Sequence, residues 1–251
     1  MAPYLSIAGF TVPVYALSLI LGVGAGLWLA AREAKRRGLN GDHVYNLGFY
    51  AILAALLGAR LVYVLGHWAA YRGALLSALS PTPTALAWPE GALIGGLTAV
   101  VYWSRSRLPV GATLDAIALG LALALAVVRL GNFFDGSGFG EPTMLPWGVA
   151  MWDAVRHPVQ LYGTAVLLGI LGILWWRRAH TSFDGGSFVL FVALYAGSRL
   201  FLEAFRADAP LLPNGVRMVQ VVALVAMLGA VGYLYRQRFA AVEAPSAAQE
   251  K

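Results

Sequence analysis

Three arginines lie inside or at the end of long apolar stretches of this 251-residue chain. They are Arg60 in "LLGARLVYVLG", Arg129 in "LAVVRLGNFF" and Arg199 in "LYAGSRLFLEAFR". A charged side chain in a bilayer costs about 3 kcal/mol even on lenient insertion scales, and the acids nearby in sequence are Asp135 and Glu203. Because a guanidinium group donates two parallel hydrogen bonds, the three arginines together favour an anionic ligand, above all a phosphate. Taken singly, each is equally consistent with snorkelling to the interface or with a structural ion pair.

A glycine-rich loop, "GNFFDGSGFGEPT", follows Arg129 and spans residues 131–143. Asn132 offers both a hydrogen-bond donor and an acceptor next to the arginine. The glycines permit positive φ angles and close approach of a ligand to the backbone, although the same residue types also form ordinary turns. These glycines are Gly131, Gly136, Gly138 and Gly140.

Further polar residues lie close to the apolar segments. Glu203 follows Arg199 by one helical turn and shares its face, so it either neutralises Arg199 or orients it for a ligand. His157 in "RHPVQLYG" is a candidate base, and a structural role at the start of a helix is the alternative. Tyr15 fits either an interfacial aromatic belt or a polar contact at the site. The pair Gly95-Gly96 most simply permits tight helix packing.

The composition defines the class of protein that must position these residues. The chain is 59% hydrophobic and 12% charged, whereas soluble domains carry about 25% charged residues. We therefore predict an all-α, polytopic membrane protein with a single domain over residues 1–239 and a disordered cytoplasmic tail over residues 240–251. The first segment is expected to stay in place as a helix, and the third is short for a bilayer. The seven predicted transmembrane helices are 12–31, 44–66, 91–104, 112–130, 159–176, 187–205 and 216–235.

The basic residues predict the orientation in the membrane. They concentrate after the first, third, fifth and seventh segments, which places the N-terminus outside and the C-terminus in the cytoplasm. The net charge of +6 is explained by this pattern, so no nucleic-acid partner is expected. With no cysteine in the chain, disulfides and thiolate metal sites are excluded. The residues that carry the pattern are Arg32, Lys35, Arg36, Arg37, Arg105, Arg107, Arg177, Arg178, Arg236 and Arg238.

"RLGNFFDGSGFG" resembles the signature of the bacterial prolipoprotein diacylglyceryl transferases, Arg-x-Gly-Asn-Phe-x-Asn-x-Glu-x-x-Gly. Other blocks resemble the family in the same order: "VYALSLILG" (14–22), "GARLVYVL" (58–65), "GGL" (95–97), "HPVQLY" (157–162) and "SRLFLEAFR" (198–206). The resemblance covers most of residues 12–235. The positions that match the signature are Arg129, Gly131, Asn132, Phe133 and Gly140.

The resemblance implies a reaction and its partners. Enzymes of this family move the diacylglyceryl group of phosphatidylglycerol to the thiol of a lipobox cysteine in the signal peptide of a preprolipoprotein. The site would lie toward the outer leaflet of the bacterial inner membrane, without a cofactor or metal. Arg129 and Arg199 would bind and activate the phosphate, Asn132 would orient the headgroup, and Tyr15 and Asp135 would assist. The lipid-binding candidates are Arg60, Gly131, Gly140, Gly95, Gly96, His157, Gln160, Glu203 and Arg206.

The chain departs from the family pattern at four positions. Ile94 stands where the family has a histidine before Gly-Gly-Leu, and Asp135, Ser137 and Gly163 replace an asparagine and two glutamates. If that histidine is the base for the thiol, Asp135 and His157 are the substitutes to examine. A divergent paralogue that binds anionic phospholipid without catalysis, or serves another acceptor, is the alternative function. An anion transporter is a third hypothesis, although no paired halves with interrupted helices are recognisable.

Overall fold

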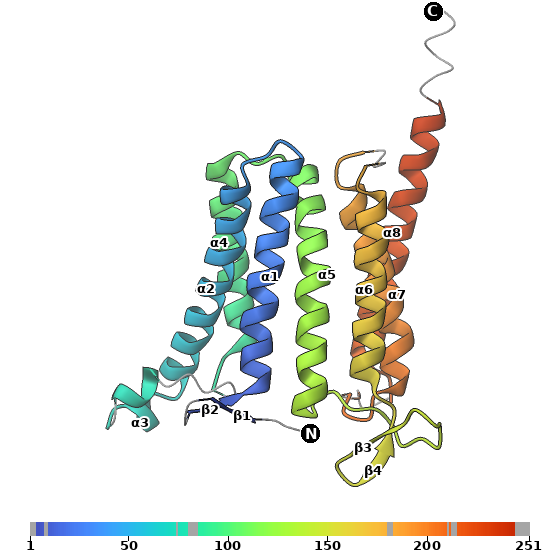
Figure 1. The fold of residues 1–251 in the computed structure, drawn as a ribbon. Helices are drawn as coiled ribbons and strands as arrows, with labels where there is room; N and C mark the ends of the chain where they lie inside the picture. The colour runs from blue at the N-terminus through green and yellow to red at the C-terminus, as the bar shows by residue number, and fades with distance from the viewer. Residues whose placement is uncertain are drawn as a thin grey trace, which may run out of the picture. The chain divides into compact units, whose positions relative to one another are not determined.

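The computed structural model describes residues 4–7, 10–73, 75–79, 85–179, 183–209, 211 and 215–243. Seven long helices each contain most of one predicted segment (Figure 1). They are α1 (Val14–Arg36), α2 (Gly41–Gly66), α4 (Trp88–Ser106), α5 (Val110–Asp135), α6 (Val159–Arg177), α7 (Gly186–Leu202) and α8 (Met218–Glu243). The short elements are β1 (Tyr4–Ile7), β2 (Phe10–Pro13), α3 (Trp68–Tyr71), η1 (Leu75–Leu79), β3 (Val149–Met151), β4 (Ala154–Arg156) and η2 (Glu203–Phe205).

The third predicted span and the predicted C-terminal tail differ from what the structure shows. Six of the described helices are long and apolar enough to cross a membrane, and α4 is not among them. The third predicted segment therefore forms a helix of 19 residues, but the count of seven spans is not confirmed. Helix α8 runs to Glu243, past the start of the predicted tail at residue 240. The rest of that predicted tail, residues 244–251, lies outside the described residues.

The chain divides into two compact units, one made of residues 1–33 and 110–251 and the other of residues 34–109. In the first unit α5 packs against α6 and α7, and α7 packs against α8 (Figure 1). Half of the apolar window of α5 is buried, compared with 11% for α8, so α5 is the central helix of this unit. Its core consists of Leu29, Ala118, Leu119, Ala122, Ala126, Leu167, Ile170, Leu174 and Phe191.

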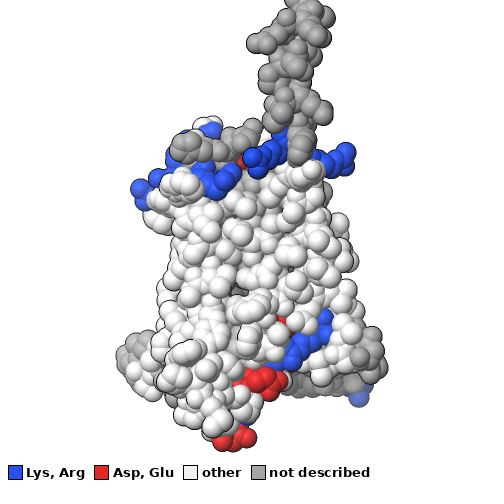
Figure 2. Space-filling view, turned by 90° about the vertical axis from the view of Figure 1, so that its right-hand side faces the viewer, with Lys and Arg blue, Asp and Glu red and all other residues white. Residues whose placement is uncertain are grey.

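The outer face of α8 is apolar and exposed, with Val222, Val225 and Leu228 among its uncovered side chains. Over the described part of the side on which α7 and α8 lie, a broad band carries no charged residue, and charged side chains gather toward its two ends (Figure 2). Continuous exposed apolar surface of this kind is expected where lipid replaces water as the solvent. The fold is therefore that of a multi-pass helical membrane protein.

A buried acid from α5 fixes the start of α7, the helix that carries Arg199. Asp115 is fully buried, and its two carboxylate oxygens accept the backbone N–H groups of Gly185 (3.1 Å) and Phe188 (2.9 Å). No residue of the first turn of α7 supplies a side-chain cap of its own. The first N–H groups of a helix lack intrahelical acceptors, so a carboxylate placed there both satisfies them and interacts favourably with the helix dipole.

In the second unit, α2 and α4 run antiparallel and approach closely through small residues. A Cβ atom on Gly91 would lie 2.5 Å from the Cβ atom of Ala59, and one on Gly95 would lie 2.6 Å from the carbonyl oxygen of Ala51. Gly96, the next residue, would meet nothing within 4 Å. The packing interpretation of the glycine pair therefore holds for Gly95, as in other membrane helices whose backbones meet at small residues.

These neighbouring glycines provide a matched pair for a stability measurement. We expect Gly95→Ala to destabilise the protein by about 1–3 kcal/mol, because the added methyl group must displace the backbone of α2. Gly96→Ala is expected to be neutral or to stabilise by up to about 1 kcal/mol through helix propensity. Unfolding in mixed micelles with increasing denaturing detergent measures both changes. Equal effects of the two substitutions would contradict the packing described here.

Candidate functional site

Arg129 and Arg199 line one small cavity between α5, α6 and α7 in the first unit. Gly163 of α6 forms part of the wall, and a Cβ atom there would lie 3.5 Å from Cδ of Arg129. This is an ordinary van der Waals distance, so the stem of Arg129 lies directly against α6 at Gly163. Of the three arginines that the sequence grouped around one ligand, Arg129 and Arg199 line this cavity, and Arg60 belongs to the second unit.

The two guanidinium groups differ in their partners. In the part of the chain that the structure describes, Arg129 receives neither a hydrogen-bond acceptor nor an ion-pair partner. Arg199 is held by Glu203, with Nη2 2.5 Å from Oε2. Because two guanidinium groups of like charge line one cavity, an anion there would be strongly attracted.

Glu203 is fully buried and holds a second arginine as well. Its Oε1 accepts a hydrogen bond from Nη1 of Arg206 at 3.2 Å, and its backbone carbonyl oxygen accepts one from Nη1 of Arg217. Oε2, although close to Arg199, receives no hydrogen bond of good geometry from a described residue. The spacing of residues in the sequence predicts only the pair with Arg199, and the structure adds the contacts of Glu203 with Arg206 and Arg217.

Arg217 is a site residue that sequence reasoning missed. It precedes α8 in a short connection, where basic residues ordinarily reflect topology. Besides its bond to the Glu203 carbonyl, its Nη2 lies 3.9 Å from Oε1 of Glu141. No helical spacing links Arg217 to Glu203, so the pattern of residues carries no signal for this contact.

The glycine-rich loop is fastened to the segment that follows Glu203. Gly138 donates its N–H to Oδ2 of Asp208 (3.0 Å), and Glu141 donates its N–H to the carbonyl oxygen of Phe205 (2.8 Å). Gly136 and Gly138 have φ angles of 82° and 69°, the left-handed region that glycine adopts without strain. The glycine-rich loop is therefore hydrogen-bonded directly to residues 205–208, which follow Glu203.

The other two loop glycines allow chain segments to touch. A Cβ atom on Gly131 would lie 1.9 Å from Oγ of Ser18 on α1, and one on Gly140 would lie 2.4 Å from the carbonyl oxygen of His157. Both glycines are therefore required for internal packing, whether or not a ligand approaches them. Through Gly131 the start of α1 is seated against the end of α5.

Two buried amide oxygens point to an incomplete hydrogen-bond network. Oδ1 of Asn132 and Oε1 of Gln160 are inaccessible to solvent and have no hydrogen-bond partner among the described residues. Nε2 of Gln160 donates to the carbonyl oxygen of Ser137 at 3.0 Å, which ties α6 to the loop. Buried polar atoms are usually satisfied, so these two oxygens leave room for donors from a ligand or from water.

His157 lies in an aromatic setting beside the loop. Its Nδ1 is 3.4 Å from the hydroxyl oxygen of Tyr162, which accepts a hydrogen bond from Nε1 of Trp147 at 2.8 Å. Its ring meets that of Phe205 edge to face at 5.3 Å. Both the structural and the catalytic interpretation of this histidine are compatible with these contacts.

Near the same loop, the turn between β3 and β4 carries an ion pair. Nη2 of Arg156 donates to Oδ1 of Asp153 at 2.6 Å, and this hydrogen bond is the main reason that the pKa of the exposed Asp153 carboxyl is lowered. Arg156 also lies over the ring of Phe139 at 4.9 Å. The pair therefore supports the hairpin against the glycine-rich loop.

Tyr15 and Asp135 lie at the ends of adjoining helices. Asp135 is the last residue of α5, and its carboxylate has neither a hydrogen bond nor an ion pair within the described ranges. Tyr15 precedes Ser18 by one turn, and Ser18 packs on Gly131, so Tyr15 lies toward the end of α5 that carries Asp135. The tyrosine hydroxyl likewise makes no hydrogen bond to a described residue.

The second unit holds the remaining candidates and gives Arg60 a structural task. Its guanidinium donates to the carbonyl oxygens of Ser77 (3.0 Å), Ala78 (2.8 Å) and Ala85 (2.8 Å). These hydrogen bonds tie Ser77, Ala78 and Ala85, which precede α4, to α2. Ile94 packs over Gly58, where a Cβ atom would lie 2.6 Å from Cδ1 of Ile94. Among the described residues, no three His, Asp or Glu side chains come together as metal ligands do.

Membrane-spanning helices around a cavity with two arginines define a multi-pass membrane protein with a cationic site. A model of the family "Prolipoprotein diacylglyceryl transferase" matches residues 3–236, and the chain belongs to this family. The resemblance seen in the sequence is thereby confirmed.

Similar proteins span almost the whole chain. The phosphatidylglycerol–prolipoprotein diacylglyceryl transferase of Clostridioides difficile (strain 630) is 33% identical over 225 residues, which cover 89% of this chain and 90% of that protein. The enzyme of the same name from Thermosynechococcus vestitus is 30% identical over 242 residues, covering 91% and 90%. Phosphatidylglycerol–prolipoprotein diacylglyceryl transferase 2 of Streptomyces coelicolor is 33% identical over 237 residues, covering 88% and 74%.

Proposed function

We propose that this chain transfers the diacylglyceryl group of phosphatidylglycerol to the thiol of a lipobox cysteine in the signal peptide of a preprolipoprotein. The observation that carries this proposal is the cavity shared by Arg129, which has no acceptor in the described part, and Arg199, which Glu203 orients. A phosphate is the anion that such planar donors bind best. The names of the relatives specify both substrates.

The reaction gathers negative charge where the arginines lie. The cysteine sulfur forms a bond to the glyceryl carbon, the bond from that carbon to the phosphate oxygen breaks, and glycerol phosphate leaves with the electron pair. Arg129 and Arg199 stabilise the charge on the leaving phosphate, because fixed donors in a partly dry site need no reorganisation. The free amide oxygen of Asn132 accepts a hydrogen bond from a hydroxyl of the headgroup.

The thiol proton requires an acceptor, and Ile94 offers none. We propose Asp135 and His157 as the two residues to test for this role, with Tyr15 assisting at the phosphate. Gly131, Gly140, Gln160 and Arg206 shape the wall of the site through the contacts described above. In the second unit, Gly95 packs against α2 and Arg60 donates hydrogen bonds to carbonyl oxygens that precede α4.

Product formation by the purified protein tests this function. We expect a lipobox peptide supplied with phosphatidylglycerol to gain a diacylglyceryl thioether and to release glycerol phosphate, both detectable by mass spectrometry. The same peptide with its cysteine replaced by serine is the control. The alternative of a non-catalytic paralogue, which Ile94 favours, predicts phosphatidylglycerol that co-purifies without product. Absence of product under conditions in which a relative is active would overturn the proposal.

We further propose seven spans, including α4, in the bacterial inner membrane, with the N-terminus outside, the C-terminus in the cytoplasm and the site toward the outer leaflet. Because the chain has no cysteine, single introduced thiols report sidedness cleanly. Met144→Cys, at a fully exposed position between α5 and β3, should react with an impermeant maleimide on intact spheroplasts. Ala179→Cys, after α6, should react only after lysis. The reverse pattern would contradict this orientation.

A further inference from the structure

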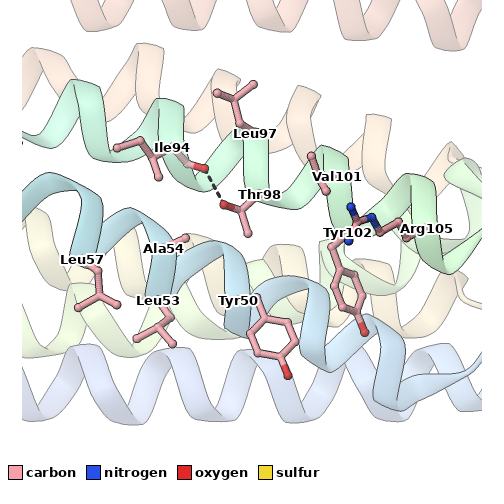
Figure 3. Close-up of a pocket in the computed structure, with 10 residues that line it drawn as sticks. All are labelled: Tyr50, Leu53, Ala54, Leu57, Ile94, Leu97, Thr98, Val101, Tyr102 and Arg105. Atoms are coloured by element: carbon pink, nitrogen blue, oxygen red, sulfur yellow. Dashed lines mark hydrogen bonds between the residues drawn. The ribbon is translucent and has the colours of Figure 1, made fainter.

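A groove of about 600 Å³ lies between α2 and α4 in the second unit, and none of the residues assigned to transfer lines it. Figure 3 shows its apolar walls, with Leu53 and Leu57 from α2 and Ile94 and Leu97 from α4. The volume falls within the range of about 300–1,000 Å³ that is usual for small-molecule sites. The hydroxyl of Thr98 donates to the Ile94 carbonyl oxygen at 2.9 Å, so it adds no free polar group to the groove.

One end of the groove is cationic and aromatic. Arg105 lies there beside Tyr102, with Tyr50 on the facing helix (Figure 3). The hydroxyl of Tyr102 is 3.1 Å from Nδ1 of His43, and its ring lies 5.6 Å from that of Tyr50. In the described part of the chain, Arg105 has neither a hydrogen bond nor an ion pair. Tyrosine rings with a basic residue are typical of the level of lipid headgroups.

The length of the groove matches one leaflet. Residues 94–105 of α4 span about 16 Å at ~1.5 Å per residue. The hydrocarbon core of a bilayer is about 30 Å thick, so the groove runs from headgroup level to roughly the bilayer midplane. Lys35 and Arg36 in the last turn of α1, and Arg37 just after it, lie next to the same end of α2, where Lys35 pairs with Asp42 at 3.0 Å. Basic residues therefore gather at the end of the unit where an anionic headgroup would lie.

We propose that this groove binds an anionic phospholipid as a resident lipid, with the phosphate on Arg105 and one acyl chain along Leu53, Leu57 and Leu97. The lipid belongs to the leaflet at the Arg105 end, which is the cytoplasmic leaflet in the proposed topology. The proposal rests on the geometry of the second unit and does not depend on the transfer function.

Titration of the full-length protein in detergent micelles tests this proposal. The probe is dioleoyl phosphatidic acid, with dioleoyl phosphatidylcholine as a neutral lipid with the same chains and inorganic phosphate as a headgroup without chains. Native mass spectrometry counts bound lipid, and the melting temperature reports stabilisation. We expect only phosphatidic acid to bind at a stoichiometric level and to raise the melting temperature. An equal response to phosphatidylcholine or to inorganic phosphate would overturn the proposal.

Matched variants locate the binding. Arg105→Gln should weaken phosphatidic acid binding about tenfold through loss of a charge-assisted contact, whereas Arg107→Gln, with the same change of charge outside the groove, should not. If both variants lost phosphatidic acid binding equally, the lipid would be attracted by general positive charge, and the proposed groove site would be overturned. The comparison is repeated with Arg129→Gln present in both proteins, so that lipid bound at the transfer site does not contribute. The difference between the Arg105 and Arg107 variants should persist there.

A second pair of variants tests the apolar part of the groove. Ala54→Phe fills the groove between Leu53 and Leu57, whereas Ile52→Phe adds a ring on an exposed position of α2 that does not line it. We expect Ala54→Phe to lose bound phosphatidic acid and Ile52→Phe to retain it. Equal binding by these two proteins would overturn the acyl-chain assignment. If Ala54→Phe fails to fold, the comparison of Arg105→Gln with Arg107→Gln remains the test of whether the lipid binds in this groove.

Discussion

Replacing Arg129 with glutamine should lower the rate of diacylglyceryl transfer by about 10²–10³ without destabilising the protein. The activity falls because a donor that stabilises the leaving phosphate is removed. The fold persists because Arg129 has no hydrogen bond or ion pair to a described residue, and removing it also relieves repulsion with Arg199. Arg129→Lys should be nearly as inactive, since an ammonium group cannot make the bidentate contact. Product formation and the melting temperature are measured on the same samples.

The control for Arg129→Gln is the same substitution at an arginine outside the cavity. Arg236→Gln changes an exposed residue near the end of α8 and should keep a transfer rate close to that of the unchanged protein. A normal transfer rate for Arg129→Gln would show that Arg129 does not contribute to catalysis and would contradict the proposed site. A large drop in its melting temperature would instead mean that Arg129 serves the fold.

Replacing Glu203 with glutamine should have the largest effect on stability, a loss of about 3–5 kcal/mol, because the buried carboxylate that serves two arginines becomes neutral. Arg199 and Arg206 would then carry charge in a buried setting without that partner. Transfer should fall as well, since Arg199 loses the contact that orients it. Unfolding in mixed micelles and product formation measure the two losses separately.

Glu141 supplies the matched control for Glu203. It is half exposed and 3.9 Å from Arg217, so Glu141→Gln should cost less than about 1 kcal/mol. The double variant Glu203→Gln with Arg199→Gln should recover part of the lost stability, because one of the uncompensated charges is gone. Additive losses in the double variant would show that the two side chains do not act on each other.

Much of the fold follows from local chemistry that the sequence displays. Long apolar segments must form helices in lipid, because each backbone N–H and C=O needs a partner within the segment. Six of the predicted segments accordingly lie mostly within α1, α2 and α5 to α8, all of which are long and apolar enough to span. The third segment showed the limit of this rule, since α4 is a helix but does not meet the same criterion.

The sequence indicated one contact of the candidate site, between Glu203 and Arg199, but it missed Arg217 and most of the other contacts. The spacing of four residues correctly indicated that Glu203 meets Arg199, because that contact lies within one helix. Arg60 showed no such signal, and only the folded chain reveals that its donors are taken by three carbonyl groups. Gly131 and Gly140 likewise proved to be places where segments touch.

By itself, then, the sequence determined that this is a helical membrane protein of a diacylglyceryl transferase family, because helix formation in lipid and a family signature are both written in local order. The tertiary structure decided which charges have partners. It left Arg129 without one in the described part, buried Glu203 among arginines from three places in the chain, and closed the loop of Gly138 onto Asp208. Such pairings depend on distances between segments far apart in sequence, and no periodicity encodes them.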